Sequence, residues 1–163
     1  MPLALEQARA LWSDAELLSV SAHGLMPSGE VQPGSGGSPA GLWFFAFRVG
    51  DGIRGLACLP SDRGEMWSPA PDPPPRAAWR DEVALDLTGV ADSDVLAQRF
   101  CGLAGWESLA GRVEDGLLVH APGGQLVARI CGAGDHTAVL DAREPDRVIS
   151  VNFEPVQLQG EVV

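Results

Sequence analysis

The chain has 163 residues, 45% of them hydrophobic, and a formal net charge of −11 at pH 7. This length suits one domain with a sizeable core, or two very small units packed together. The 11 basic residues form no cluster that offsets the negative charge, which repels phosphate backbones and anionic lipids, so nucleic acid and membrane surfaces are disfavoured as partners.

The first half of the chain predicts one helix followed by antiparallel strands. Apolar residues at helical spacing predict a helix over 3–12, and alternating or apolar runs predict strands over 15–23, 42–49 and 53–59. Residues 26–41, between the first two strands, are rich in glycine, proline and serine. We expect them to bury little and to form a long mobile connection.

The predicted strand 42–49 is apolar on both faces, because successive side chains of a strand point to opposite sides. One face carries Trp43, Phe45, Phe47 and Val49, and the other carries Leu42, Phe44, Ala46 and Arg48. We favour the interpretation in which other parts of the chain cover both faces. The alternative is that the Phe44 face is an exposed apolar patch that meets a partner or a second copy.

Residues 68–91 form a predicted proline-rich connector between the two halves. Proline favours an extended segment here, because it fixes φ and removes a backbone donor. After it, Asp92 or Ser93 can cap a helix over 94–104. Further strands are predicted over 116–121, 125–131, 137–142 and 147–153. The predicted fold is therefore α+β, with two similar units over 1–67 and 92–163, each a helix packed on an antiparallel β-sheet.

The first half resembles the repeats of PepSY-like proteins. The run from Trp12 to Ser21 (WSDAELLSVS) is similar to their "DAELVSV"-type strand, and the run from Gly41 to Phe47 (GLWFFAF) is similar to their W-x-F-x-F strand. Trp67-Ser68-Pro69 and Asp92 to Leu96 lie where such proteins close one repeat and open the next. The resemblance covers about residues 3–104. It implies a cystatin-like unit that is usually non-enzymatic and often inhibitory or protein-binding.

Small acidic cytosolic chaperones of type III secretion are also similar in their order of helices and strands. That resemblance implies a dimer that binds an exported protein. The final helix of those chaperones has no counterpart here, because Pro145 and Pro155 interrupt residues 143–163. The chaperone is therefore the alternative prediction.

Metal ligation would need several cysteine, histidine or carboxylate side chains at suitable spacing. The only local pair is Cys131 with His136, while Cys58 and Cys101 stand alone in a predicted strand and a predicted helix. An odd number of cysteines in a chain of this length favours reduced thiols over a disulfide framework. We predict no metal site and no cofactor.

The sequence indicates no catalytic residues either. Of the histidines His23, His120 and His136, His120 alternates with apolar residues and is expected on the solvent side of its strand. Three other groups have structural explanations. Gly132-Ala133-Gly134 is explained as a glycine-rich turn, Asp92 with Asp94 as a helix start, and Glu114 with Asp115 as a turn.

We predict a non-catalytic protein-binding module with a regulatory or inhibitory role, and not an enzyme. The predicted partner is a protein of unknown identity, or a second copy of the chain. A small acidic cytosolic chaperone of a secreted protein is the alternative, and a small hydrolase has the least support. The predicted location is the cytoplasm, or the periplasm if a leader has been removed, because residues 1–12 lack the basic start of a signal peptide.

Overall fold

Two helices and nine strands make up the part of the chain that the computed structural model describes, namely residues 2–32, 41–61, 64–71, 82–104, 116–132, 136–152 and 154–155. The helices are α1 (Pro2–Leu11) and α2 (Ser93–Ala104). The strands are β1 (Glu16–His23), β2 (Leu42–Val49), β3 (Gly52–Ser61), β4 (Gly64–Ala70), β5 (Gly116–His120), β6 (Val127–Cys131), β7 (Thr137–Asp141), β8 (Val148–Val151) and β9 (Glu154–Pro155). The predicted helices and strands are confirmed to within about two residues, and β4 and β9 are additional. Neither described helix is long and apolar enough to cross a membrane.

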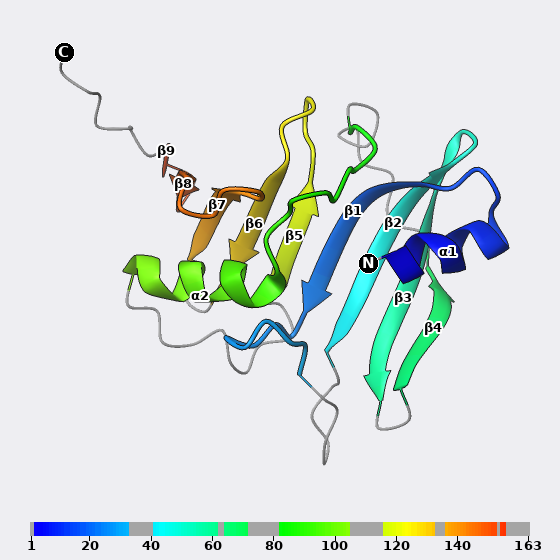
Figure 1. The fold of residues 1–163 in the computed structure, drawn as a ribbon, viewed down its shortest axis with the longest axis horizontal. Helices are drawn as coiled ribbons and strands as arrows, with labels where there is room; N and C mark the ends of the chain where they lie inside the picture. Colours follow the sequence, from blue (N-terminus) through cyan, green and yellow to red (C-terminus); the bar gives the residue numbers. More distant parts are fainter. Residues whose placement is uncertain are drawn as a thin grey trace.

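All described strands belong to one antiparallel sheet with the order β4-β3-β2-β1-β5-β6-β7-β8-β9. Strands β1 and β5 lie at the middle, where Ser19 is opposite His120 and Ala22 is opposite Leu117. Figure 1 shows this sheet with both helices in front of it. The predicted α+β class is confirmed. The strands of the two predicted units join in one sheet instead of forming two separate sheets.

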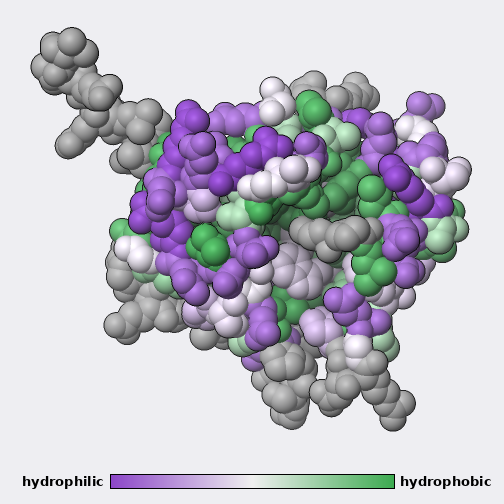
Figure 2. Space-filling model, in the orientation of Figure 1, coloured by the Kyte–Doolittle hydropathy of each residue, from purple (hydrophilic) through white to green (hydrophobic). Residues whose placement is uncertain are grey.

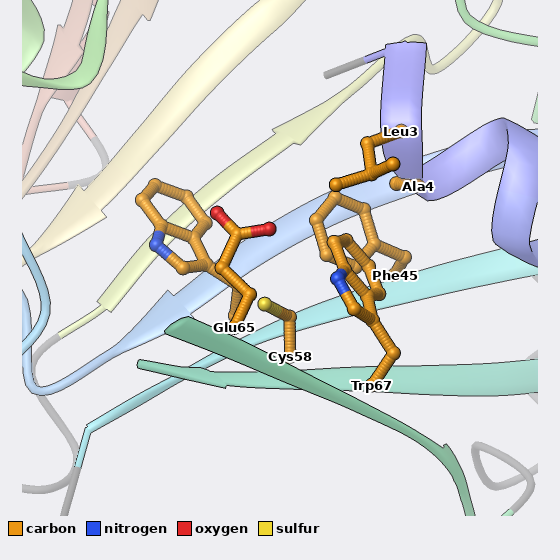
Figure 3. Close-up of a pocket in the computed structure, with 7 residues that line it drawn as sticks. Leu3, Ala4, Phe45, Cys58, Glu65 and Trp67 are labelled. Carbon is orange, nitrogen blue, oxygen red and sulfur yellow. The ribbon is translucent and has the colours of Figure 1, made fainter. Parts of the chain in front are cut away.

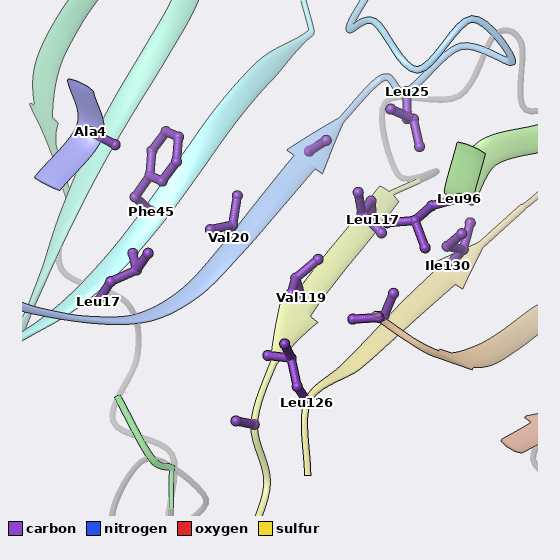
Figure 4. Close-up of a cluster of buried hydrophobic side chains, with 14 of the residues drawn as sticks. Ala4, Leu17, Val20, Leu25, Phe45, Leu96, Leu117, Val119, Leu126 and Ile130 are labelled. Carbon is purple, nitrogen blue, oxygen red and sulfur yellow. The ribbon is translucent and has the colours of Figure 1, made fainter. Parts of the chain in front are cut away.

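The core lies between the helices and one face of the sheet. Val20 of β1 lies beside Phe45 of β2 on this face, and both side chains are buried. Figure 4 shows the cluster crossing the sheet, from Ala4 of α1 and Phe45 of β2 to Ile130 of β6 and Leu96 of α2. Burial of this continuous apolar surface is the dominant favourable term in folding, and it ties both helices to the same side.

The predicted faces of β2 are confirmed. Phe45 and Phe47 are 4% and 0% exposed and belong to the core on the helix side, whereas Phe44 is half-buried on the opposite face. The Phe44 ring lies over Gly55 of β3, because a Cβ atom on Gly55 would be 2.7 Å from Cζ of the ring. Ala46, on the Phe44 side, is fully buried. The opposite face is therefore partly covered.

Of residues 26–41 the structure describes 26–32 and 41, and the prediction that this segment buries little is wrong at Val31, which belongs to the core. Leu25 and Val31 form an isolated antiparallel bridge, and both side chains belong to the core. The turn between them contacts the start of α2, where Ser93 Oγ donates a hydrogen bond to the Gly29 carbonyl at 2.7 Å. Glycine and proline dominate the composition of this segment, but Val31 within it and Leu25 just before it are core residues. Residues 33–40 lie outside the described residues, and their mobility stays a prediction.

The predicted connector is partly built into the sheet. Strand β4 continues to Ala70, three residues beyond the boundary expected after residue 67. Further along, the Leu85 N–H donates to the Leu17 carbonyl and the Ala91 N–H donates to the Ala142 carbonyl. The start of the connector therefore pairs with the first half, and its end bonds to both halves. Residues 72–81 lie outside the described residues.

Candidate functional site

Three side chains on neighbouring strands form a row near the N-terminal end of α1. In the register of the sheet, Trp43 of β2 is opposite Cys58 of β3, and Cys58 is opposite Trp67 of β4. Residues directly opposite each other on antiparallel strands point to the same face, which here is the face that carries the helices. A small thiol between two large indoles leaves unfilled space above Cys58.

This space is a cavity of about 190 Å³. Its lining consists of Leu3, Ala4, Trp43, Phe45, Cys58, Glu65 and Trp67. In Figure 3, Leu3 and Ala4 of α1 lie above Phe45 and Trp67, and the Glu65 carboxylate lies to their left, above Cys58. Leu3 is 41% exposed and Glu65 is also exposed, so the cavity opens to solvent beside these two side chains.

Trp67 is positioned by a neighbouring ring and carries an unsatisfied donor. Its ring centroid is 5.4 Å from that of Phe45, with 34° between the ring planes. The indole Nε1–H is buried, and among the described residues it has no hydrogen-bond acceptor. A buried donor without an acceptor costs about 1–3 kcal/mol. A bound group that offers an oxygen atom to Trp67 would recover that cost.

Cys58, at the floor of the cavity, is not activated as a nucleophile. Burial, and secondly the charge of Glu65, raises the pKa of the Cys58 thiol to about 11. The thiolate is the reactive form of cysteine, so the thiol is protonated and unreactive at neutral pH. The cavity therefore combines apolar walls, one exposed carboxylate and one unsatisfied N–H, a combination suited to binding.

A second group of polar side chains lies where the connector meets the end of β5. Glu82 is buried; its Oε1 is 2.9 Å from His120 Nδ1, and its Oε2 accepts a hydrogen bond from the Ala121 N–H at 3.2 Å. Arg48 of β2 donates to the Glu82 carbonyl at 2.8 Å. The prediction that His120 lies on the face opposite the apolar residues of its strand is confirmed, since Leu117 and Val119 are core residues and His120 is not. Glu82 partly covers His120 on that face, so its side chain is 21% exposed. The two residues are 38 positions apart, and no local pattern could indicate the pair.

Replacing Glu82 with alanine is expected to lower the free energy of unfolding by about 1–3 kcal/mol, because the buried Ala121 N–H and His120 both lose their acceptor. The matched control is Glu16→Ala. The Glu16 carboxylate pairs with Arg48 at 3.3 Å but its side chain is 53% exposed, so its loss should cost at most about 1 kcal/mol. Urea unfolding of the two variants measures the difference, and equal losses would show that the Glu82 contacts contribute no more than a surface ion pair.

The remaining histidines and cysteines do not come together. His23 is opposite Gly116 at one end of the β1–β5 pair, and His120 is at the other end. Cys131 Sγ accepts a hydrogen bond from Thr137 Oγ1 at 3.7 Å, and the Gly132 N–H donates to the His136 carbonyl. Cys58, Cys101 and Cys131 are free cysteines. Within the described ranges, no group of three or more potential metal ligands occurs.

The acidic pair at the start of α2 has a structural role. The Asp94 carboxylate accepts a hydrogen bond from the Val95 N–H at 2.8 Å, which satisfies a backbone donor of the first helical turn. Asp92 contributes its main-chain carbonyl, which accepts the Leu96 N–H at 3.1 Å as in any helix. Glu114, Asp115, Ala133 and Gly134 lie outside the described residues.

Comparison with known proteins gives a similar fold but no family. No protein-family model matches the chain, and no curated protein matches it. A solved structure with a similar fold is that of a protein from Clostridium difficile 630 described as a candidate lipoprotein. The TM-score is 0.57 and the sequence identity 10%, over 91% of this chain and 88% of that chain. At this identity the similarity shows the fold alone, so the resemblance to PepSY-like proteins is supported only as far as a helix-and-antiparallel-sheet architecture.

Proposed function

We propose that the protein is a non-catalytic binding module that contacts a protein partner through the cavity beside α1. The observation that carries this proposal is the row Trp43, Cys58 and Trp67, which places two half-buried indoles around an open space on the helix side. Tryptophan is enriched among the side chains that dominate protein interfaces, where it commonly surrounds or fills such pockets.

The chemistry of the cavity favours binding over catalysis. Acid–base and nucleophilic mechanisms need a titratable side chain within reach of a second group that activates or orients it. Cys58 and Glu65 are the titratable side chains among the lining residues, and the pKa of Cys58 is raised instead of lowered. No histidine is among the lining residues that the structure describes. These features support a role in recognition.

The two exposed leucines of α1 offer a test. Leu3 lines the cavity and is 41% exposed, whereas Leu11, on the same helix, is 52% exposed and is not part of the lining. We expect Leu3→Gln to reduce recovery of the native partner in affinity capture with mass spectrometry at least about tenfold, a change that corresponds to about 1.4 kcal/mol. Leu11→Gln should leave recovery unchanged. Equal effects of the two variants would place the contact elsewhere.

We propose a regulatory or inhibitory role on the basis of the order of helices and strands along the chain. Both α1 and α2 are followed by antiparallel strands, and the two sets meet at β1 and β5. This order supports an internal repeat of the kind that the resemblance to PepSY-like proteins implies. Such an arrangement offers one helix-bearing face to a partner. A chaperone-like role would instead require a stable dimer, and the molecular mass from light scattering distinguishes the two.

We also propose a cytoplasmic location, because the three free cysteines suit a reducing compartment. The description as a lipoprotein concerns the Clostridium difficile protein, and a lipid-anchored or exported form is the alternative. Fractionation of cells that express the natural gene decides between the two locations, since a cytoplasmic protein should be absent from the membrane and exported fractions.

A further inference from the structure

The size of the cavity limits what can enter it. Its volume is about 190 Å³, which is below the range of about 300–1,000 Å³ typical of sites that enclose a drug-sized ligand. One side chain, together with the main-chain atoms next to it, matches this space better than a whole cofactor does. Figure 2 shows that hydrophobic residues gather near the middle of the helix-bearing face, with hydrophilic residues towards both sides.

The charge of the cavity favours a cation. Glu65 is the charged residue among the described lining, and its carboxylate acts on the interior, because it contributes to the raised pKa of Cys58. Trp43, Phe45 and Trp67 add aromatic rings, whose faces attract cations. The chain as a whole carries a net charge of −11, which also attracts a basic partner and repels an acidic one.

The unsatisfied donor gives the occupant a second requirement. The buried Nε1–H of Trp67 needs an acceptor, and a cationic head group has none to offer. An amino-acid residue in a peptide has both features, since its side chain can carry the charge and its own carbonyl can accept a hydrogen bond. This pairing of requirements points to a residue of a protein partner and not to a simple amine.

We propose that the cavity beside α1 receives an arginine side chain of a partner protein, with the guanidinium at Glu65, the aliphatic stem between the Trp43 and Trp67 indoles, and a neighbouring main-chain carbonyl at Trp67 Nε1. Arginine fits better than lysine because its planar guanidinium binds a carboxylate through two parallel hydrogen bonds and stacks on aromatic rings. This inference rests on the proposed function and names the chemistry that the same cavity recognises.

The test uses a minimal arginine and its uncharged isostere. The probes are N-acetyl-arginine N-methylamide and N-acetyl-citrulline N-methylamide, which have nearly the same shape and differ in charge. Binding at low ionic strength is followed by the indole 1H–15N signals of the full chain, with the Trp67 signal assigned from its absence in Trp67→Phe. We expect a saturable shift of this signal by the arginine probe, and affinity at least about tenfold weaker for the citrulline probe.

Variants separate recognition from general attraction. Glu65→Gln should remove the preference for arginine over citrulline. Trp67→Phe should weaken both probes, and in this variant binding is followed by the indole signal of Trp43, which also lines the cavity. Glu16→Gln removes an exposed carboxylate that pairs with Arg48 away from the cavity, so it should change neither probe. Equal binding of the two probes, no saturation at millimolar concentration, or an effect of Glu16→Gln as large as that of Glu65→Gln would overturn the inference.

Failure of this inference is distinguishable from failure of the proposed function. If Leu3→Gln lowers partner recovery while the arginine probe does not bind, the cavity contacts a partner of other chemistry and only the arginine assignment falls. If the probe binds as expected and partner recovery is the same for Leu3→Gln and Leu11→Gln, the arginine pocket stands and the proposed contact with the partner falls.

Discussion

Replacing Phe47 with alanine is expected to lower the free energy of unfolding by about 3–5 kcal/mol. Phe47 is one of the largest fully buried side chains in the described part of the protein, at 0% exposure, and its ring centroid is 6.4 Å from that of Trp12. Truncation leaves a cavity under the end of α1 that the neighbouring residues cannot fill. A small domain has about 5–15 kcal/mol of stability in total, so this loss is a large fraction of it.

Phe44→Ala is the matched control on the same strand. Its side chain lies on the opposite face of β2 and is half-buried over Gly55, so its removal should cost about 1–2 kcal/mol. Urea unfolding gives both values, and an unchanged slope of free energy against urea shows that the native and unfolded states are still comparable. If the two variants lost the same stability, the face that carries Phe44 would be as much a core as the face under the helices.

The faces of this strand could be predicted because the alternation of side chains is a local property. Residues two positions apart point the same way in any strand, so Phe45 and Phe47 had to share a face whatever surrounded them. The bounds of α1 and β1 followed from equally local patterns. The pairing of β1 with β5 joins residues about a hundred positions apart, such as Ser19 with His120, and no local pattern specifies it.

The candidate site could not be predicted, because it depends on strand β4. No strand is predicted over residues 64–67, and residues 68–70, which include Pro69, fall in the predicted proline-rich connector. Proline is tolerated at the edge of a sheet, where its missing donor breaks no ladder bond, and β4 is the first strand in the sheet order. The alternation of Glu65, Trp67 and Pro69 was the available signal. Without β4, Trp67 has no position relative to Trp43, and the space above Cys58 is not defined.

The contact between the turn at 24–32 and α2 also could not be predicted from the amino-acid composition. A window rich in glycine and proline indicates a loop, and the loop is present. Composition does not show that Leu25 and Val31 enter the core, or that Gly29 lies against the backbone at the start of α2. Two apolar residues in a polar window are a weak signal on their own. Here they attach the first half of the chain to the second.

Gly29→Ala is therefore expected to destabilise the protein by about 2–5 kcal/mol. Gly29 has φ +81°, a conformation that costs other residues about 1–2 kcal/mol. A Cβ atom at this position would also be 2.1 Å from the Asp94 backbone nitrogen and 2.4 Å from its Cα, so the turn and the helix must move apart. That movement would break the hydrogen bond from Ser93 Oγ to the Gly29 carbonyl.

Gly50→Ala isolates the part of this loss that is due to the backbone conformation alone. Gly50 has φ +55°, and an added Cβ would meet nothing within 4 Å, so the expected cost is about 1–2 kcal/mol. Urea unfolding of both variants gives the difference, which measures how tightly the turn is packed against α2. Hydrogen exchange shows where the stability is lost. In Gly29→Ala the amides of the first turn of α2 should exchange faster, while in Gly50→Ala they should not. If the two variants lost the same stability and exchange in α2 were unchanged, the turn would be able to move away from α2 at no cost. The connection between the two halves would then depend on the pairing of β1 with β5 and not on this turn.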